Sequence, residues 1–385
     1  FENGDLESQR YACLALTNLS CTKANHAVMV DTGTLPLMTT LLDHQDIEIR
    51  NTCIFTIANF AANPINHQLI LKEGNLPKLV ALLSVPDKNA QLRAVSALRG
   101  LSTDSDIRLD IVDSDALDPL LKLAKSDDVE VQMETLATMC NLSLCGCIGD
   151  NPLSFLDACD VQNLVAFLCS ADATYRLFGA VTIGNIVSSI ALQDKVISGG
   201  ALAPLVTVAN AADLETQRCI AYALCNLAAD PRRRVDIVRE GGLPSLISMA
   251  CSEDRSDQLA AMATIRGISS QAENRRQVFE ANMVEALTLG TRSIDIEVKV
   301  ESAGVFAALS INDDNKLDMA NSDQLLINLV ELLKVVDLRC LRQSMGCLAN
   351  LSERQESHPF LRRFQIHVVV LEHIHNSDIA LNREV

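Results

Sequence analysis

The sequence predicts an all-α solenoid, and three observations lead to that fold class. A short motif that reads ALTNLS at its first occurrence recurs along the 385 residues. Successive copies are separated by 41, 41, 41, 44, 41, 41, 41 and 42 residues. The composition is 48% apolar with three Tyr, ten Phe and no Trp, which favours aliphatic packing between helices. A period of about 40–47 residues is typical of stacked helical units that cannot bury their apolar faces alone.

The copies are aligned on the Asn of the first ALTNLS motif, which we name the signature position. It falls at Asn18, Asn59, Gly100, Asn141, Asn185, Asn226, Gly267, Ala308 and Asn350. We therefore expect a single array of about nine repeats over residues 1–385. The 44-residue step predicts an inserted loop near residues 145–152. Both ends fall inside a repeat and the first residue is not Met, so we expect a piece of a longer protein.

Each repeat is predicted to contain three helices. Segments such as HAVMVD from His26 and RVDIVRE from Arg234 predict a short first helix. A glycine precedes the expected middle helix in four repeats, where a flexible residue permits a sharp change of direction: Gly33, Gly74, Gly200 and Gly242. A proline falls in the first turn of that helix, which needs no N–H donor, at Pro36, Pro77, Pro119, Pro204 and Pro244.

The third helix ends in the recurring motif and has an apolar period of about 3.6 residues. Counted from the signature position, residues at minus 5, minus 2 and plus 1 are apolar nearly throughout, as in Ile54, Ile57 and Phe60. That face predicts a continuous core, which would include Cys13, Leu16 and Leu19 of the first copy. Residues at 0, minus 4, minus 7 and minus 11 lie on roughly the opposite side, and we name them the signature stripe. Stacked repeats would turn this stripe into the lining of a surface.

The repeats resemble the armadillo family over essentially the whole chain. The resemblance consists of three helices per repeat, Leu-Pro before the middle helix and LxNL at the end of the third helix. HEAT repeats are a near neighbour, but they have two helices and lack the recurring Asn. The resemblance implies a right-handed superhelix whose third helices line a concave groove, with a ladder of Asn that holds an extended partner peptide. The matching residues are Asn18, Asn59, Asn141, Asn185, Asn226 and Asn350, whereas Gly100, Gly267 and Ala308 lack the amide.

The side chains of the signature stripe allow two roles at most positions. An Asn amide can hold a peptide backbone, but it can equally cap its own helix or bond a neighbouring loop. An acidic row on the stripe would favour ligands that carry Lys or Arg, or would stabilise helix N-termini: Glu7, Glu48, Glu130, Glu215 and Glu297 at minus 11, with Glu134 and Glu301 at minus 7. Phe55, Arg93, Phe178 and Tyr222 are further candidates for partner contact, because aromatic residues and Arg are common interface anchors.

Bulk charge and missing motifs exclude several function classes. A net charge of −17 and a pI near 4.8 argue against nucleic-acid binding and against an anionic membrane surface. No apolar run approaches about 20 residues, so direct membrane insertion is not expected. Thirteen Cys, mostly at apolar helix positions, indicate a reducing compartment such as the cytoplasm. Without a phosphate loop, zinc motif or nucleophile elbow, we expect neither enzyme activity nor a cofactor or metal.

The sequence therefore predicts a non-enzymatic scaffold or adaptor that binds an extended or helical segment of a partner protein, and we expect that segment to be basic. The chain is most similar to β-catenin-like and vacuolar adaptor scaffolds. That resemblance implies a link between membrane proteins and cytoskeletal or signalling partners. An importin-α-like receptor for basic nuclear signals is one alternative. It is disfavoured because position minus 4, which carries Trp in that family, holds Leu14, Phe55, Ser96, Ala137, Val181 and Tyr222. A regulatory segment of a larger protein is the other alternative.

Overall fold

The computed structural model describes residues 5–144, 160–209 and 213–371, and every regular element in these ranges is helical. This confirms the predicted all-α solenoid. The chain divides into two compact units, Phe1–Ala201 (unit 1) and Leu202–Val385 (unit 2). The loop expected near residues 145–152 lies outside the described residues.

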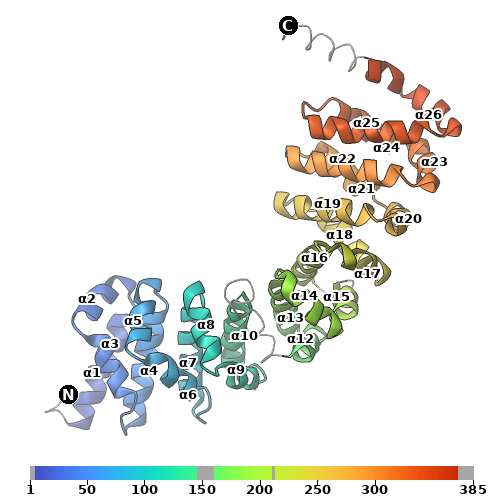
Figure 1. The fold of residues 1–385 in the computed structure, drawn as a ribbon. Helices are drawn as coiled ribbons and strands as arrows, with labels where there is room; N and C mark the ends of the chain where they lie inside the picture. The colour runs from blue at the N-terminus through green and yellow to red at the C-terminus, as the bar shows by residue number, and fades with distance from the viewer. Residues whose placement is uncertain (1–4, 145–159, 210–212, 372–385) are drawn as a thin grey trace. The chain divides into compact units, whose positions relative to one another are not determined.

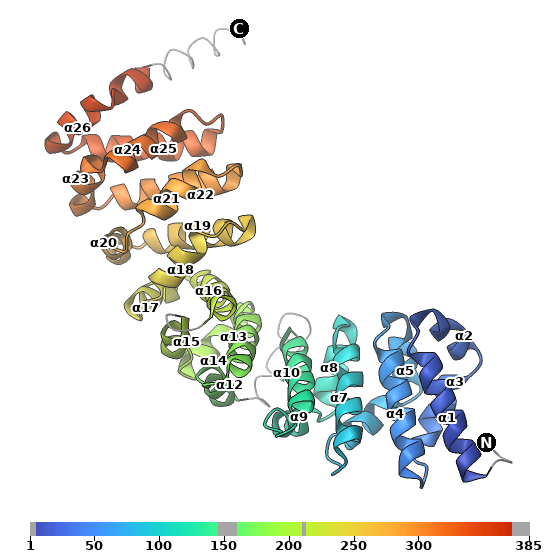
Figure 2. The ribbon, with the colours of Figure 1, turned by 180° about the vertical axis from the view of Figure 1, so that it is seen from behind.

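The third helices of the described residues all have the same length, 15 residues. In unit 1 they are α1 (Leu6–Ser20), α4 (Ile47–Ala61), α7 (Lys88–Ser102), α10 (Val129–Ser143) and α13 (Ala173–Val187). In unit 2 they are α16 (Leu214–Ala228), α19 (Arg255–Ser269), α22 (Ile296–Ser310) and α25 (Leu338–Ser352). Within each unit, consecutive third helices pack side by side, as Figures 1 and 2 show from opposite directions.

The first and middle helices of each repeat are shorter. The first helices are α2 (His26–Asp31), α5 (His67–Lys72), α8 (Ser105–Asp113), α14 (Ile190–Ser198), α17 (Arg234–Arg239), α20 (Arg275–Glu280), α23 (Asp313–Asn321) and α26 (His358–Arg363). The middle helices are α3 (Thr34–Leu41), α6 (Asn75–Leu82), α9 (Leu117–Leu123), α12 (Val161–Leu168), α15 (Leu202–Ala209), α18 (Leu243–Ala250), α21 (Val284–Arg292) and α24 (Asp323–Leu333).

The turn from the first to the middle helix often requires a left-handed backbone. Gly33, Gly74 and Gly200 have φ angles of 79°, 71° and 80°, which glycine adopts without strain. Before α18 the left-handed residue is Gly241, with φ 88°, and not the expected Gly242, whose φ is −74°. A Cβ on Gly242 would lie 2.8 Å from Cγ2 of Ile237, so close packing restricts this position instead.

The apolar face of the third helix forms the core of the solenoid. In α4, α7 and α10, the side chains at minus 5, minus 2 and plus 1 are at most 3% exposed, as predicted. In α1, however, Leu19 is 51% exposed. The described helices that pack on α1 all follow it in the chain, so nothing described covers its other side. The expected burial of Leu19 was therefore wrong.

In each described repeat, an aspartate caps the N-terminus of the third helix. These residues are Asp5, Asp46, Asp87, Asp128, Asp172, Asp213, Asp254, Asp295 and Asp337, and each side chain accepts from a backbone N–H of the first turn. The preceding third helix reinforces several caps. Arg10 donates to Asp46 at 2.5 Å, and Asn51 donates to Asp87 at 2.8 Å. The caps therefore link neighbouring repeats as well as starting the helices.

These caps predict that the fold is sensitive to acid. Arg10 holds the pKa of Asp46 at about 2, Asn51 lowers the pKa of Asp87, and Arg255 lowers the pKa of Asp295. An unfolded Asp titrates near pH 3.9, so the stability from these charged carboxyls is complete above that pH and is lost as the pH falls towards 2. We expect the urea midpoint, followed by circular dichroism, to fall over this window, and the fall to be smaller in Asp46→Asn. A midpoint that is constant down to pH 2 would contradict the prediction.

Candidate protein-binding surface

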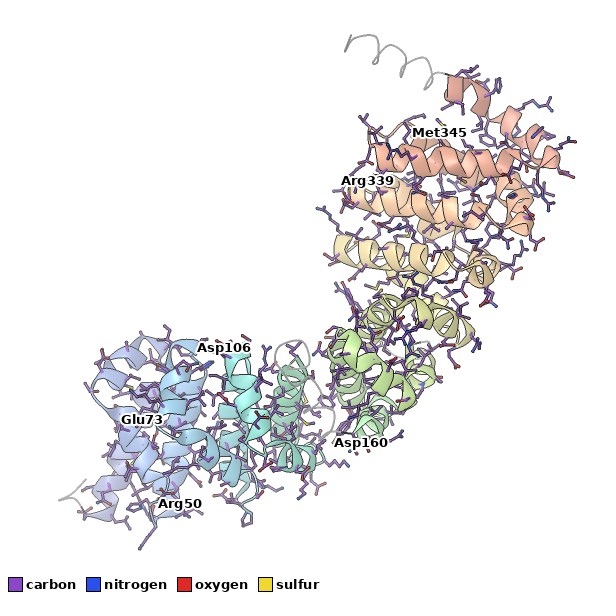
Figure 3. All side chains as sticks on the ribbon, in the orientation of Figure 1. Arg50, Glu73, Asp106, Asp160, Arg339 and Met345 are labelled. Carbon is purple, nitrogen blue, oxygen red and sulfur yellow. The ribbon has the colours of Figure 1, made fainter. Side chains whose placement is uncertain are left out.

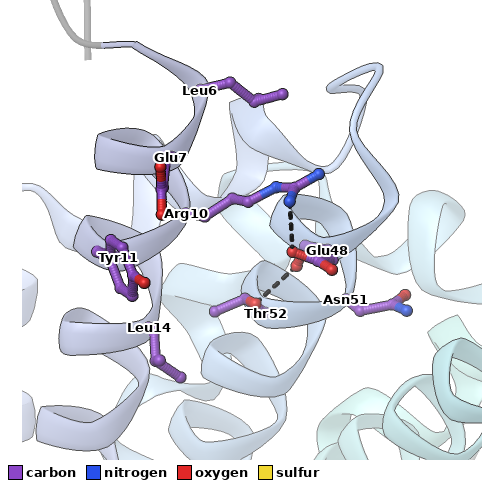
Figure 4. A pocket seen from close by; sticks show the side chains of 8 residues that line it. All are labelled: Leu6, Glu7, Arg10, Tyr11, Leu14, Glu48, Asn51 and Thr52. Carbon is purple, nitrogen blue, oxygen red and sulfur yellow. Dashed lines mark hydrogen bonds and ion pairs between the residues drawn. The ribbon is translucent and has the colours of Figure 1, made fainter.

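In unit 1 the signature stripe lines a cavity between α1 and α4 (Figure 4). Its volume is about 590 Å³, and its lining is Leu6, Glu7, Arg10, Tyr11, Leu14, Glu48, Asn51 and Thr52. Tyr11 is 64% exposed and Leu14 is 48% exposed. Nη1 of Arg10 lies 3.0 Å from Oε2 of Glu48. The cavity therefore combines open apolar surface with carboxylates, one of which is already paired.

Four of the predicted ladder residues bond the preceding repeat. The Nδ2 atoms of Asn59, Asn141, Asn185 and Asn350 donate to the Oγ atoms of Ser20, Ser102, Ser143 and Ser310, at 2.9, 3.0, 2.9 and 2.9 Å. Each Ser lies two residues after the signature position of the preceding repeat. Asn226 is half-buried in α16, and Asn18 is exposed on α1. The ladder thus ties consecutive third helices together, which is the structural role that the sequence left open.

The serine geometry fixes which end of each amide remains available. The hydroxyl of Ser102 donates its only proton to the carbonyl of Arg99 at 2.8 Å. It can therefore only accept from Asn141, which must present its NH2 group to the serine. The Oδ1 atom of Asn141 has no bonding partner among the described residues. A structural tie and an open acceptor for a ligand thus coexist in one side chain.

Where the ladder is broken by glycine, the preceding repeat carries Ala in place of Ser. Gly100 lies against Ala61, and a Cβ there would be 2.5 Å from the Ala61 carbonyl oxygen. For Gly267, the residue at the serine position of the preceding repeat is Ala228. A Cβ on Gly267 would meet the guanidinium of Arg234 first, at 3.4 Å. Beside each glycine an Arg reaches the next repeat: Arg99 pairs with Glu134 at 2.6 Å and Arg266 pairs with Glu301 at 2.5 Å. An Arg–Glu pair accompanies the missing Asn–Ser bond at both places.

Much of the acidic row is neutralised inside the protein. Besides Glu134 and Glu301, Glu48 pairs with Arg10, and Glu297 pairs with Arg339 at 2.7 Å. The remaining members, Glu7, Glu130 and Glu215, are exposed and form no ion pair within the described residues. Three carboxylates of the acidic row therefore remain available to a positively charged ligand.

The four predicted anchors lie in different surroundings. Phe55 is half-buried on α4, and the guanidinium of Arg93 lies 3.8 Å from its ring centroid. The hydroxyl of Tyr222 donates to Asp257, a carboxylate that also pairs with Arg218 at 2.8 Å. Phe55, Arg93 and Tyr222 are thus partly accessible, each with an internal partner.

Phe178 does not belong to the accessible set, because it is 3% exposed. Its ring packs edge-on against Phe167 of α12, with centroids 5.1 Å apart. The next residue, Gly179, lies so close to α12 that a Cβ would be 2.5 Å from the backbone nitrogen of Leu168. This close approach of the two helices covers Phe178, so its expected role at the surface is corrected to one in the core.

Comparisons with known proteins agree with this geometry. A family model described as Armadillo/beta-catenin-like repeat matches residues 104–144. An engineered protein of known structure is similar with a TM-score of 0.78 at 25% identity, over 96% of this chain and 91% of that chain. A designed armadillo repeat protein is similar with a TM-score of 0.55 at 24% identity, over 61% and 99% respectively. The chain has an armadillo-repeat fold, and residues 104–144 match the armadillo repeat itself.

Two curated relatives of this armadillo array are named Vacuolar protein 8. The protein from Schizosaccharomyces pombe is 24% identical over 200 residues, which is 51% of this chain and 36% of that relative. The protein from Candida albicans is 42% identical over 65 residues, which is 17% of this chain and 11% of that relative. The alignments thus span 36% of one relative and 11% of the other. They confirm the expected resemblance to vacuolar armadillo proteins. No helix in the described ranges is long and apolar enough to cross a bilayer.

Sequence reasoning missed a second recurring contact of the armadillo repeats. In seven repeats the residue eight positions after the signature bonds the carbonyl two positions after it, and so caps the third helix: His26, His67, Arg108, Gln193, Arg234, Arg275 and His358. A recurring His, Arg or Gln at this spacing was the available signal. The Asp that precedes the third helix of each repeat was a still more regular signal. Both signals concern the scaffold and not the ligand.

Proposed function

We propose that this armadillo array is a non-enzymatic, protein-binding adaptor whose signature stripe receives an extended segment of a partner protein. The observation that carries the proposal is the cavity between α1 and α4, where stripe residues of two consecutive repeats leave Tyr11 and Leu14 open to solvent. An extended peptide alternates its side chains between two faces, so it can place side chains in such cavities while its backbone bonds the Asn amides.

The residual charge of the stripe favours a segment with basic side chains. Glu7, Glu130 and Glu215 form no internal ion pair in the described ranges, whereas the positive stripe residues already have partners. Arg93 lies over Phe55, and Arg339 pairs with Glu297. Lys and Arg stems would also cover apolar surface such as Tyr11. The resemblance to vacuolar adaptors extends the proposal to a cytoplasmic protein that is recruited to membranes through its partners.

Binding through the ladder is tested with a matched pair of variants. Short peptides would be selected from a random library on the parent chain and titrated against Asn141→Ala and Ser102→Ala. Asn141→Ala removes the open acceptor and should weaken binding about tenfold, equivalent to a hydrogen bond worth about 1.4 kcal/mol. Ser102→Ala removes only the structural tie and should leave the affinity within about twofold.

Three outcomes would count against the proposal: no peptide enriched above background, equal binding by Asn141→Ala and the parent, or an equal loss in both variants. An excess of acidic over basic side chains in the selected peptides would reject the proposed partner charge alone. The import-receptor alternative has its own test. Micromolar or tighter binding of a lysine-rich nuclear signal peptide would favour it over a general adaptor, although the chain has no Trp.

A further inference from the structure

Two neighbouring turns of unit 2 expose aliphatic side chains. Ile294, between α21 and α22, is 102% exposed, and Val336, between α24 and α25, is 103% exposed. Ile296 and Leu338, the first residues of the two following helices, are 38% and 68% exposed. Such exposure contributes nothing to the core, so the fold itself does not require these side chains.

The two turns lie side by side because their helices are joined there. Arg339, labelled in Figure 3, donates two hydrogen bonds to Glu297, at 2.9 and 2.7 Å, and these residues lie three positions after Val336 and Ile294. Packed helices are about 8–10 Å apart. The four aliphatic side chains, Ile294, Ile296, Val336 and Leu338, therefore share one edge of the solenoid, which we name the turn edge.

Ile294 and Val336 differ in residue type from the other repeats, whereas the first residue of the third helix is exposed and aliphatic elsewhere too, as in Leu6, Ile47, Val129 and Leu214. The residue fourteen positions before the signature is Gln45, Pro86, Asp127, Ala171 or Glu253 in other described repeats. Only the turns at Ile294 and Val336 hold a large aliphatic residue there, within the described ranges. The fold accepts small, polar or charged residues at this position in other repeats, yet two consecutive repeats carry exposed aliphatic residues there. This indicates that the two side chains contact something outside the chain.

The turn edge is also positive, in contrast to the chain as a whole. Residues 289–300 and 333–343 contain five Lys or Arg against three Asp or Glu, on a chain with a net charge of −17. All three acids have partners: Asp295 pairs with Arg255, and Glu297 and Asp337 pair with Arg339. Arg292 and Arg342 form no ion pair among the described residues. Two unpaired cations therefore flank the exposed aliphatic residues.

We propose that the turn edge is a docking site for an acidic amphipathic helix of another protein. Two turns about 8–10 Å apart match apolar side chains at i and i+7 of a helix, which are about 10.5 Å apart along its axis. Carboxylates on the flanks of that helix would reach Arg292 and Arg342. The four aliphatic residues lie outside the signature stripe, whose residues Glu297 and Arg339 border the turn edge, and the turn edge selects the opposite charge in its partner.

A protein partner fits these observations better than a lipid surface. Exposed aliphatic residues beside Arg also occur where proteins touch anionic membranes. Here, however, the whole chain carries a charge of −17, which such a membrane repels. An acidic helix needs only the local positive field of the turn edge.

The test uses two labelled synthetic helical peptides and the whole chain. One peptide has Leu at i, i+4 and i+7 with Glu on its flanks, and the other has Lys in place of every Glu. By fluorescence anisotropy we expect the Glu peptide to bind and the Lys peptide not to bind. The double variant Ile294→Ser/Val336→Ser should weaken binding at least about tenfold, because both apolar contacts are lost. Arg292→Gln/Arg342→Gln, which removes both charges, should weaken binding at low salt and reduce its salt dependence.

Three controls separate this site from the signature stripe and from general surface effects. Ile65→Ser changes an equally isolated aliphatic residue of unit 1, 88% exposed, and should leave binding unchanged. Asn141→Ala should also leave it unchanged, so failure of the stripe proposal would not affect this result. Thermal unfolding of the serine variant should match the parent, because the replaced side chains are exposed.

The proposal is overturned if the Glu peptide does not bind, if both peptides bind equally, or if the serine variant binds as well as the parent. It is also overturned if the parent, but not the serine variant, co-sediments with phosphatidylserine-containing vesicles. That result would assign the turn edge to a membrane.

Discussion

Phe60→Ala is expected to lower the free energy of unfolding by about 3–5 kcal/mol, the usual range for a buried Phe replaced by Ala. Phe60 on α4 is 0% exposed, and its ring packs edge-on against His26 with centroids 5.0 Å apart. The same His26 caps the end of α1 through the Ser20 carbonyl. A cavity at this point would therefore loosen both the core and the tie between repeats. Urea titration followed by circular dichroism measures the effect.

Phe55→Ala, five residues earlier on the same helix, is the matched control. Phe55 lies on the signature stripe, half-buried beneath Arg93. We expect it to cost about 1 kcal/mol, the size of a cation–π contact at a partly exposed site, and to weaken binding of peptides selected on the parent chain. If both variants lost equal stability, the separation of a core face from a binding face on α4 would be wrong.

Gly100→Ala is expected to destabilise unit 1 by about 1–3 kcal/mol, although alanine is normally the better helix former. The added Cβ would lie 2.5 Å from the carbonyl oxygen and 2.7 Å from the carbonyl carbon of Ala61, and a backbone group cannot move aside as a flexible side chain can. The same clash applies to Asn, the commonest residue at the signature position. Restoring the ladder at Gly100 should therefore harm the fold.

Gly346→Ala provides the opposite expectation in a helix of equal length. Gly346 lies inside α25, and a Cβ there meets nothing within 4 Å. We expect a gain of about 0.5–1 kcal/mol, the ordinary advantage of Ala over Gly in a helix. Thermal unfolding of both variants beside the parent measures the contrast. A stabilising Gly100→Ala would show that α4 and α7 can separate more easily than their packing indicates.

The sequence by itself determined the architecture, because each repeat carries local signals that act within a few residues. The spacing of the motif located the third helix of each repeat. The apolar period of these helices identified the buried face in α4, α7 and α10. Capping Asp and first-turn Pro act on the neighbouring backbone alone. The sequence also identified the stripe on which the cavity at Tyr11 and Leu14 lies.

Only the tertiary structure decided which stripe residues remain available to a ligand, because that depends on side chains of neighbouring helices. The bond from Asn141 to Ser102, the pairing of Glu134 with Arg99 and the covering of Phe178 by α12 depend on how adjacent helices are offset. The same offset makes Gly100 necessary against the Ala61 carbonyl. Periodicity gives the direction of a side chain from its own helix, but the distance to the next helix decides whether it meets a partner or solvent.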